Sequence, residues 1–264
     1  MVKEKCMSID VIERLVRKGE ETDRILPVAL MFVPPVLTFI GVLLMIASSK
    51  EQQYYHHYYH GYYYEYASTE PDYTLLALGL LFIAVGAVVG VYIVYSLISR
   101  RNAHMERTLT LYDAISKHVE DQDLSARLKE SVLRMRAEQG ESKNPILWIV
   151  IYLLSNVVPL LGVFVVVYIF HFLNKDFVKH DRNERIILEQ LSSVLPMGDT
   201  LQMTKIGKFP DRNTVIYFVL TLLTFGLFEI YWFYTLIRDP NEHFTEHRIV
   251  EARILDALKS TQSG

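Results

Sequence analysis

The chain has 264 residues, of which 51% are hydrophobic, and its 27 basic and 30 acidic side chains leave a formal net charge of −3. This near balance gives no basic surface of the kind that binds nucleic acid, so we predict no nucleic-acid partner. Cys6 is the only cysteine, which excludes an internal disulfide and a cysteine-based zinc site.

The first 24 residues are charged and contain no apolar stretch typical of a signal peptide. Ser8 is suited to cap a short helix whose apolar face includes Ile12 and Leu15, and Gly19 is suited to end it. Residues 1–24 are therefore predicted to form an amphipathic helix. Their six lysines and arginines place this helix in the cytoplasm.

Four apolar blocks hold most of the remaining hydrophobic residues, and nearly all charges lie between them. A membrane-spanning helix needs roughly 20 apolar residues, and each block has at least that length. The sequence therefore predicts an all-α, polytopic protein of the cell membrane, with the lipid bilayer as its principal partner. The four blocks are residues 25–48, 74–99, 146–173 and 214–237.

Helix-breaking residues interrupt three of these blocks: Pro34 and Pro35 in the first, Pro159 in the third and Gly226 in the fourth. Proline removes a backbone donor, and in lipid the freed carbonyl needs another partner. Segments three and four can therefore be either broken spanning helices or re-entrant hairpins that return to the side from which they came.

The loop between the first two blocks, residues 50–73, is rich in tyrosine and histidine. Its only lysine or arginine is Lys50, which predicts that it lies outside the cell. Two histidines four residues apart can share a metal ion if the segment is helical, as with His56 and His60, and His57 lies beside them. The alternative is an aromatic tract at the membrane surface.

Two later connections are rich in charge. Residues 100–143 carry nine lysines and arginines and show two apolar stripes at helical spacing, which predicts a cytoplasmic helical hairpin. Residues 174–212 carry seven more. Simple alternation of four spanning segments would place these seven outside, whereas re-entrant hairpins would keep them inside. Chain organisation is accordingly predicted as 1–24, 25–99, 100–143, 144–212 and 213–264, the last ending in an amphipathic helix.

The ends of segments two, three and four resemble one another and suggest an internal repeat. In each, a tyrosine is followed after five residues by a leucine and after twelve by a histidine, and an amphipathic stretch follows. Interfacial composition alone is the alternative explanation. The repeat positions are Tyr92, Leu97 and His104; Tyr168, Leu173 and His180; and Tyr231, Leu236 and His243.

Two further features carry candidate chemistry. The segment His243–Phe244–Thr245–Glu246–His247 matches the H-x-x-E-H pattern of inverted zinc proteases, in which two histidines bind the metal. A solvated helix face is the alternative. Glu229 is the only carboxylate inside a predicted membrane segment, and an ionisable residue there is either functional or a packing hydrogen bond.

The fourth segment, LLTFGLFEIYWFYTLIRDPNEHF, resembles a widespread and functionally uncharacterised prokaryotic membrane family. The shared pattern is T-x-G-[IL]-[YF]-x-x-Y-W-x-Y followed by a charged helix. The resemblance covers about 35 residues and implies a membrane location, with no activity to carry over. The matching residues are Thr224, Gly226, Leu227, Phe228, Tyr231, Trp232 and Tyr234.

The leading functional hypothesis is a structural or scaffolding membrane protein that assembles with itself or with a membrane-protein partner. It follows from the apolar stripes, the broken segments and the lack of phosphate-loop, nucleophile-elbow and dinucleotide motifs. A small channel or transporter, based on Glu229, is the first alternative. The second is a metal-binding protein, in which His56, His57, His60, His243 and His247 hold a transition metal; no other cofactor is predicted.

Overall fold

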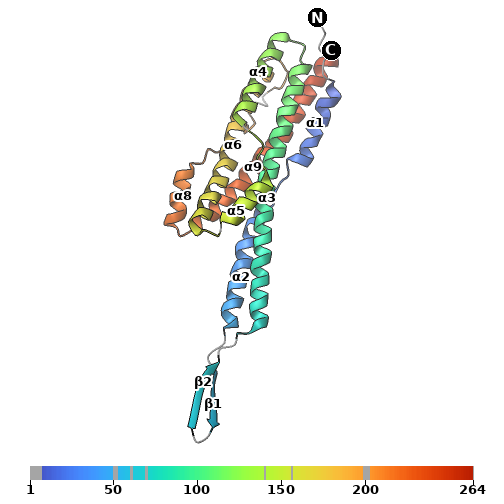
Figure 1. Cartoon of the computed structure of the whole chain (residues 1–264). Helices are drawn as coiled ribbons and strands as arrows, with labels where there is room; N and C mark the ends of the chain where they lie inside the picture. The colour runs from blue at the N-terminus through green and yellow to red at the C-terminus, as the bar shows by residue number, and fades with distance from the viewer. Residues whose placement is uncertain are drawn as a thin grey trace. The chain divides into compact units, whose positions relative to one another are not determined.

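The computed structural model describes residues 8–49, 53–59, 62–68, 71–139, 141–155, 157–198 and 203–263, so Cys6, His60 and Lys50 lie outside the described residues (Figure 1). The described chain is helical apart from one β-hairpin, which confirms the helical fold class. It divides into two compact units. One unit comprises residues 29–93, and the other comprises residues 1–28 together with 94–264.

The first unit is built around the close packing of two apolar helices. A 3₁₀ turn, Val28–Phe32, leads into α2 (Val33–Ser48), and the second apolar block begins α3 (Tyr73–His118). Pro34 and Pro35 occupy the first turn of α2, where a missing N–H costs nothing, so they start the helix rather than interrupt it. A Cβ atom built on Gly79 would lie 2.7 Å from the carbonyl oxygen of Gly41, so only glycine permits this approach.

The connection between α2 and α3 contains an antiparallel hairpin of β1 (Gln53–Tyr59) and β2 (Tyr62–Ser68), in which His56 is opposite Glu65. The metal hypothesis assumed a helix from His56 to His60. His56 lies in a strand and His60 lies outside the described residues, so the hypothesis stays a prediction. Tyrosine, the commonest residue of both strands, favours β structure.

The second unit contains α1 (Ile9–Thr22), the end of α3, and a set of helices that follow it: α4 (Gln122–Gln139), α5 (Pro145–Ser155), α6 (Pro159–Ser192), α8 (Thr214–Leu223) and α9 (Leu227–Ser263). Residues 100–143, predicted as a helical hairpin, comprise the end of α3 and all of α4. The apolar stripe of α4 is buried as its spacing predicts, with Leu124, Leu128, Val132 and Met135 no more than 2% exposed.

The core of this polar half joins segments that are far apart in sequence. α4 packs against α6 and α1 against α9. Ile12 of α1, Leu111 of α3, Leu128 of α4, Leu188 of α6 and Ile254 of α9 belong to one buried apolar cluster. Burial of such side chains contributes roughly 1.5–3 kcal/mol each, so this cluster fixes the relative positions of α3, α6 and α9 toward their C-terminal ends.

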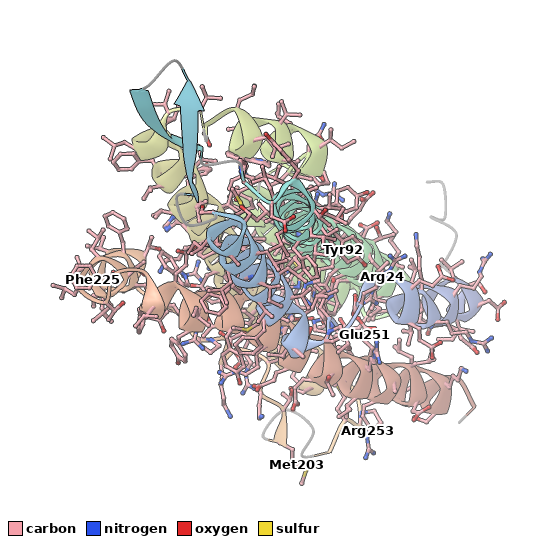
Figure 2. All side chains as sticks on the ribbon, turned by 90° about the horizontal axis from the view of Figure 1, so that it is seen from below. Arg24, Tyr92, Met203, Phe225, Glu251 and Arg253 are labelled. Atoms are coloured by element: carbon pink, nitrogen blue, oxygen red, sulfur yellow. The ribbon has the colours of Figure 1, made fainter. Side chains whose placement is uncertain are left out.

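The third and fourth apolar blocks are each divided into two helices. α5 and α6 are separated at residues 156–158, and α8 and α9 at residues 224–226; in both cases the two helices pack together (Figure 1). At the second break Phe225 and Gly226 both adopt positive φ values, of 52° and 91°, which reverse the chain. Phe225 is 99% exposed and points outward at the end of this turn (Figure 2).

Among the residues that the structure describes, three helical segments are long and apolar enough to cross a membrane: Val28–Ser48, Tyr73–His118 and Leu160–Ser192. Helices α5 and α8 are apolar but too short. These helices are compatible with a multi-pass membrane protein. The prediction of four spanning segments is not confirmed, because the third and fourth blocks are not continuous helices.

Candidate metal centre

The histidines at the three repeat positions converge on one buried point. His104 comes from α3, His180 from α6 and His243 from α9, and His247 joins them one turn further along α9. Each offers a ring nitrogen, and the four nitrogens all lie within 4.8 Å of one another. Their exposed fractions are between 0% and 5%. All four lie in the polar parts of their helices, beyond the apolar blocks.

The ring nitrogens face one another closely. Nε2 of His104 is 3.2 Å from Nε2 of His180. Two ligand nitrogens on a tetrahedral metal, with bonds of about 2.1 Å, are separated by about 3.4 Å, so this pair already has the spacing of adjacent ligands. Nε2 of His243 has no hydrogen-bond partner within the described residues. The cluster thus presents imidazole lone pairs to a shared space.

Three of the four rings have a carboxylate at their other nitrogen. Nδ1 of His104 is 2.9 Å from Asp23 Oδ1, and Nδ1 of His247 is 3.0 Å from Glu251 Oε1. Nδ1 of His243 is 3.3 Å from Asp181 Oδ1. In protein metal sites a carboxylate commonly accepts the Nδ1 proton, which fixes the tautomer and leaves Nε2 free to bind the metal. Such a hydrogen bond orients the rings of His104 and His247, whereas the contact of His243 with Asp181 is an ion-pair contact without a hydrogen bond to Oδ1.

Glu184 of α6 lies at the centre of the cluster. Its carboxylate oxygens are 2.5 and 2.6 Å from Nε2 of His247, and Oε2 is 3.7 Å from Nε2 of His243 and 3.8 Å from Nε2 of His180. The hydroxyl of Tyr112 donates to Oε1 at 2.6 Å. Glu184 can therefore add an oxygen ligand to the four nitrogens, with Tyr112 holding its carboxylate in place.

The enclosed charges favour a cation. Asp23, Asp181, Glu184 and Glu251 supply four carboxylates, and the one described guanidinium in contact with them is that of Arg107, which donates to Asp23 and Glu251 at 2.8 Å. Four negative charges and one positive charge leave an excess of −3 if the imidazoles are neutral. Such an excess inside protein requires compensation, either by protons on imidazoles or by a metal ion.

His247 shows the proton-based form of this compensation. Burial alone would lower the pKa of His247, but the carboxylates of Glu184 and Glu251 outweigh it and raise the pKa to about 10. Without a metal, His247 therefore carries a proton between two carboxylates. A cation at the same position would satisfy the same oxygens.

The N-terminal helix reaches the cluster through its last turn. Asp23 caps α1, its N–H bonding to the carbonyl of Gly19, and the side chain of Arg248 donates to the Asp23 carbonyl. A Cβ atom on Gly19 would lie 3.3 Å from the Arg107 guanidinium, so the absence of a side chain lets α1 approach Arg107. Figure 2 shows Glu251 in the interior and Arg253, two residues along α9, on the outside.

Apolar side chains line one side of the histidine cluster. Met105, Phe177 and Phe244 are buried together, with Phe209 packed against them, and the Phe244 ring centroid is 4.7 Å from that of His104. A small pocket of about 80 Å³ reaches His243 and Asp181 from the surface beside Phe209. The apolar wall lowers the local dielectric, and the pocket is a short route from solvent.

The residues proposed from the H-x-x-E-H pattern are only partly brought together. His243 and His247 are in the cluster, whereas Glu246 bonds to the backbone N–H of Lys205 and to the Thr204 hydroxyl, away from the imidazoles. Glu246 is therefore not positioned to activate a metal-bound water, and the protease interpretation lacks its base. Glu184, from another helix, has the central position instead.

Other repeat positions have matching environments. The three leucines, Leu97, Leu173 and Leu236, are between 2% and 4% exposed. The three tyrosines, Tyr92, Tyr168 and Tyr231, are between 44% and 56% exposed. Equivalent burial at each position accords with a repeated unit, although the repeat itself stays a prediction.

Glu229 lies in the first turn of α9, away from the histidine cluster along that helix. It borders a cavity between α5, α6, α8 and α9. Within the described residues its carboxylate has no hydrogen bond or ion pair.

Several residues of the centre are not recognisable from local sequence. Asp23, at the end of α1, contacts His104 across 81 residues, and Glu184 contacts His247 across 63 residues, although Glu184 also lies four residues after His180 on α6. Tyr112 and Asp181 share helices with His104 and His180, but their contacts are with Glu184 and His243 on other helices. For His104 and His180 a signal did exist, since the repeat aligns them with His243. That alignment pointed to structural equivalence and not to shared metal binding.

One part of the chain matches a known family model. Residues 212–255 match the model of a domain of unknown function, DUF4234. The match contains Glu229, His243, His247 and Glu251, and so it covers the α9 side of the centre and excludes His104 and His180. No curated protein and no solved structure matches the chain. The matched segment is thus consistent with the uncharacterised family that the fourth segment resembles.

Proposed function

We propose that this chain is a multi-pass membrane protein that binds one transition-metal cation through His104, His180, His243 and His247, with Glu184 as an oxygen ligand. The observation that supports this proposal is the convergence of four buried imidazoles from three helices. A chance gathering is unfavourable, because buried polar groups without partners cost free energy. A cation would provide the partner that Nε2 of His243 lacks.

The donor set favours particular metals. Imidazole nitrogen suits zinc, copper, iron and nickel, whereas magnesium and calcium prefer oxygen. The four nitrogens and the Glu184 oxygen would occupy the coordination positions with protein atoms, as in structural sites, whereas catalytic zinc keeps an open position. The proposed role is therefore structural: the cation would join α3, α6 and α9, and through Asp23 would also secure α1.

The same convergence supports a membrane arrangement. If His104, His180 and His243 meet, the polar halves of their helices share one side of the bilayer. Helices α5 and α8, of 11 and 10 residues, are about 16 and 15 Å long, or half of the ~30 Å hydrocarbon core. We therefore propose that α5–α6 and α8–α9 are re-entrant hairpins. Residues 174–212 are then cytoplasmic, which removes the conflict over their basic residues.

Exposed apolar side chains at the hairpin turns accord with this arrangement. Val157 and Leu160 are 80% and 76% exposed at the first turn, and Phe225 and Leu227 are 99% and 71% exposed at the second. In water such tips would be costly, whereas in the hydrocarbon core they are favourable.

The test is a metal analysis of the full chain purified in detergent. Mass spectrometry of the metal content should give about one transition-metal ion per chain. After chelation, Co²⁺ added back should give the visible absorption bands of a four- or five-coordinate nitrogen-rich site. His104→Ala and Glu184→Gln should reduce metal content, whereas His171→Ala serves as the matched control, because His171 bonds to Thr214 outside the cluster.

The outcomes are distinct. Stoichiometric metal lost in His104→Ala and retained in His171→Ala supports the proposal. A folded wild-type chain that contains no metal and shows no Co²⁺ bands at micromolar Co²⁺ overturns it, and His247 then acts as a proton-bearing bridge between carboxylates. The Co²⁺ spectrum of the wild type decides the matter even if a buried histidine variant fails to fold.

The scaffolding hypothesis stays a prediction that is compatible with a structural metal, and an oligomer in native mass spectrometry would support it. The structure gives less support to the transport hypothesis. Its cavity does reach Glu229, but Val, Phe and Leu side chains form most of the wall, which is poorly suited to water or ions.

A further inference from the structure

The cavity beside Glu229 has the character of a binding site for an amphiphile. It has a volume of about 480 Å³ and lies between the two broken helix pairs, α5–α6 and α8–α9. This is within the range of ~300–1,000 Å³ found for small-molecule sites. Most of its wall is apolar, including Val163, Phe170, Phe218 and Leu222. A ligand there would be largely hydrocarbon.

The polar groups of the wall are few, and the most strongly charged has no partner. The hydroxyl of Thr221 donates a hydrogen bond to the carbonyl of Tyr217, 2.8 Å away on the same helix. The Glu229 carboxylate makes no hydrogen bond or ion pair to another described residue. The start of α9 favours a negative charge, because the helix dipole is positive at its N-terminus. A carboxylate facing an apolar cavity is stable there only when it is protonated or paired with a cation.

We propose that this cavity binds a membrane-soluble amphiphile whose polar end is a protonated amine, with the ammonium group paired to Glu229 and the hydrocarbon tail along α6 and α8. The charge of the ammonium complements the unpaired carboxylate, and the tail matches the apolar wall. This site does not depend on the metal centre, because none of the four histidines lines the cavity.

Trp232 provides a built-in reporter. It lines the cavity and is 3% exposed, and the only other tryptophan is Trp148. In a Trp148→Phe variant, Trp232 fluorescence can be followed as a long-chain amine brominated along its tail is added to the protein in phosphatidylcholine nanodiscs. Bromine quenches tryptophan only at close range. The equivalent brominated alcohol and fatty acid distinguish the contribution of charge from that of the tail.

The expected result is saturable quenching by the amine, at concentrations at least ten-fold lower than for the alcohol or the acid. Glu229→Gln should remove this preference while leaving the Trp232 emission maximum unchanged. Glu242→Gln, on the same helix but exposed and paired with Arg238, should keep it. Equal quenching by all three compounds, or an amine preference that survives Glu229→Gln, would overturn the proposal.

Discussion

A proline inside α9 leaves one backbone carbonyl without its helical N–H donor. The side chain of a buried arginine donates a hydrogen bond to this carbonyl instead. Pro240 lacks the N–H that would bond to Leu236. Arg100 of α3 donates through Nη2 to the carbonyls of Leu236, at 2.9 Å, and Ile237, at 3.3 Å. The same guanidinium donates to the Asn241 side chain at 2.7 Å. This contact sets the position of α9 against α3 directly before the histidine cluster.

We expect Arg100→Met to lower the free energy of unfolding by roughly 1–3 kcal/mol, because it leaves a buried carbonyl unsatisfied. In a Pro240→Ala background the N–H of residue 240 should donate to the carbonyl of Leu236. The loss of unfolding free energy caused by Arg100→Met should then be smaller. Thermal or denaturant unfolding of the four proteins in detergent gives the coupling energy. An equal cost in both backgrounds would show that Arg100 acts through its other contacts.

At the scale of elements, the packing of α2 against α3 requires glycine at position 79 and has room for a side chain at position 90. A Cβ on Gly79 would lie 2.7 Å from the Gly41 carbonyl oxygen, a backbone atom that cannot move alone. A Cβ on Gly90 would be 4.0 Å from its nearest neighbour, the ring of Pro34. Both glycines are inside α3, so the two positions make a matched pair.

We expect Gly79→Ala to separate α2 from α3 and to lower the unfolding temperature. Gly90→Ala should be neutral or slightly stabilising, since alanine is favoured over glycine in a helix by roughly 1 kcal/mol. Limited proteolysis between α2 and α3 and the unfolding temperature in detergent measure both effects. If the two substitutions behave alike, close backbone contact is not what holds the pair together.

At the scale of the whole molecule, the proposed sidedness can be measured with cysteines in a Cys6→Ser background. Glu130 of α4 and Lys208 of the later polar segment are exposed, and Tyr73 at the start of α3 is 66% exposed. We expect cysteines at 130 and 208 to react with a membrane-impermeant thiol reagent only after permeabilisation, because both segments would be cytoplasmic. A cysteine at 73 should react in intact cells. Labelling of 208 from outside would contradict the re-entrant hairpins.

The sequence alone was sufficient for the helical class, the apolar helices and the breaks in the third and fourth blocks, whereas Pro34 and Pro35, predicted to interrupt the first block, start α2 instead. These properties follow from composition and from residues such as Pro159 and Gly226, which act locally. It was also sufficient to align His104, His180 and His243. It was not sufficient for the strands Gln53–Tyr59 and Tyr62–Ser68, because the Tyr- and His-rich tract has no clear helical or strand periodicity.

Only the tertiary structure decided that the aligned histidines meet and which carboxylates orient them. Asp23 contacts His104 and Glu184 contacts His247 across long stretches of chain, and the packing of α1, α3, α6 and α9 brings these pairs together. Periodicity specifies which face of a helix is apolar, but it carries no information about which helix covers that face. The site is a property of that pairing, and for this reason it could not be read from any one segment.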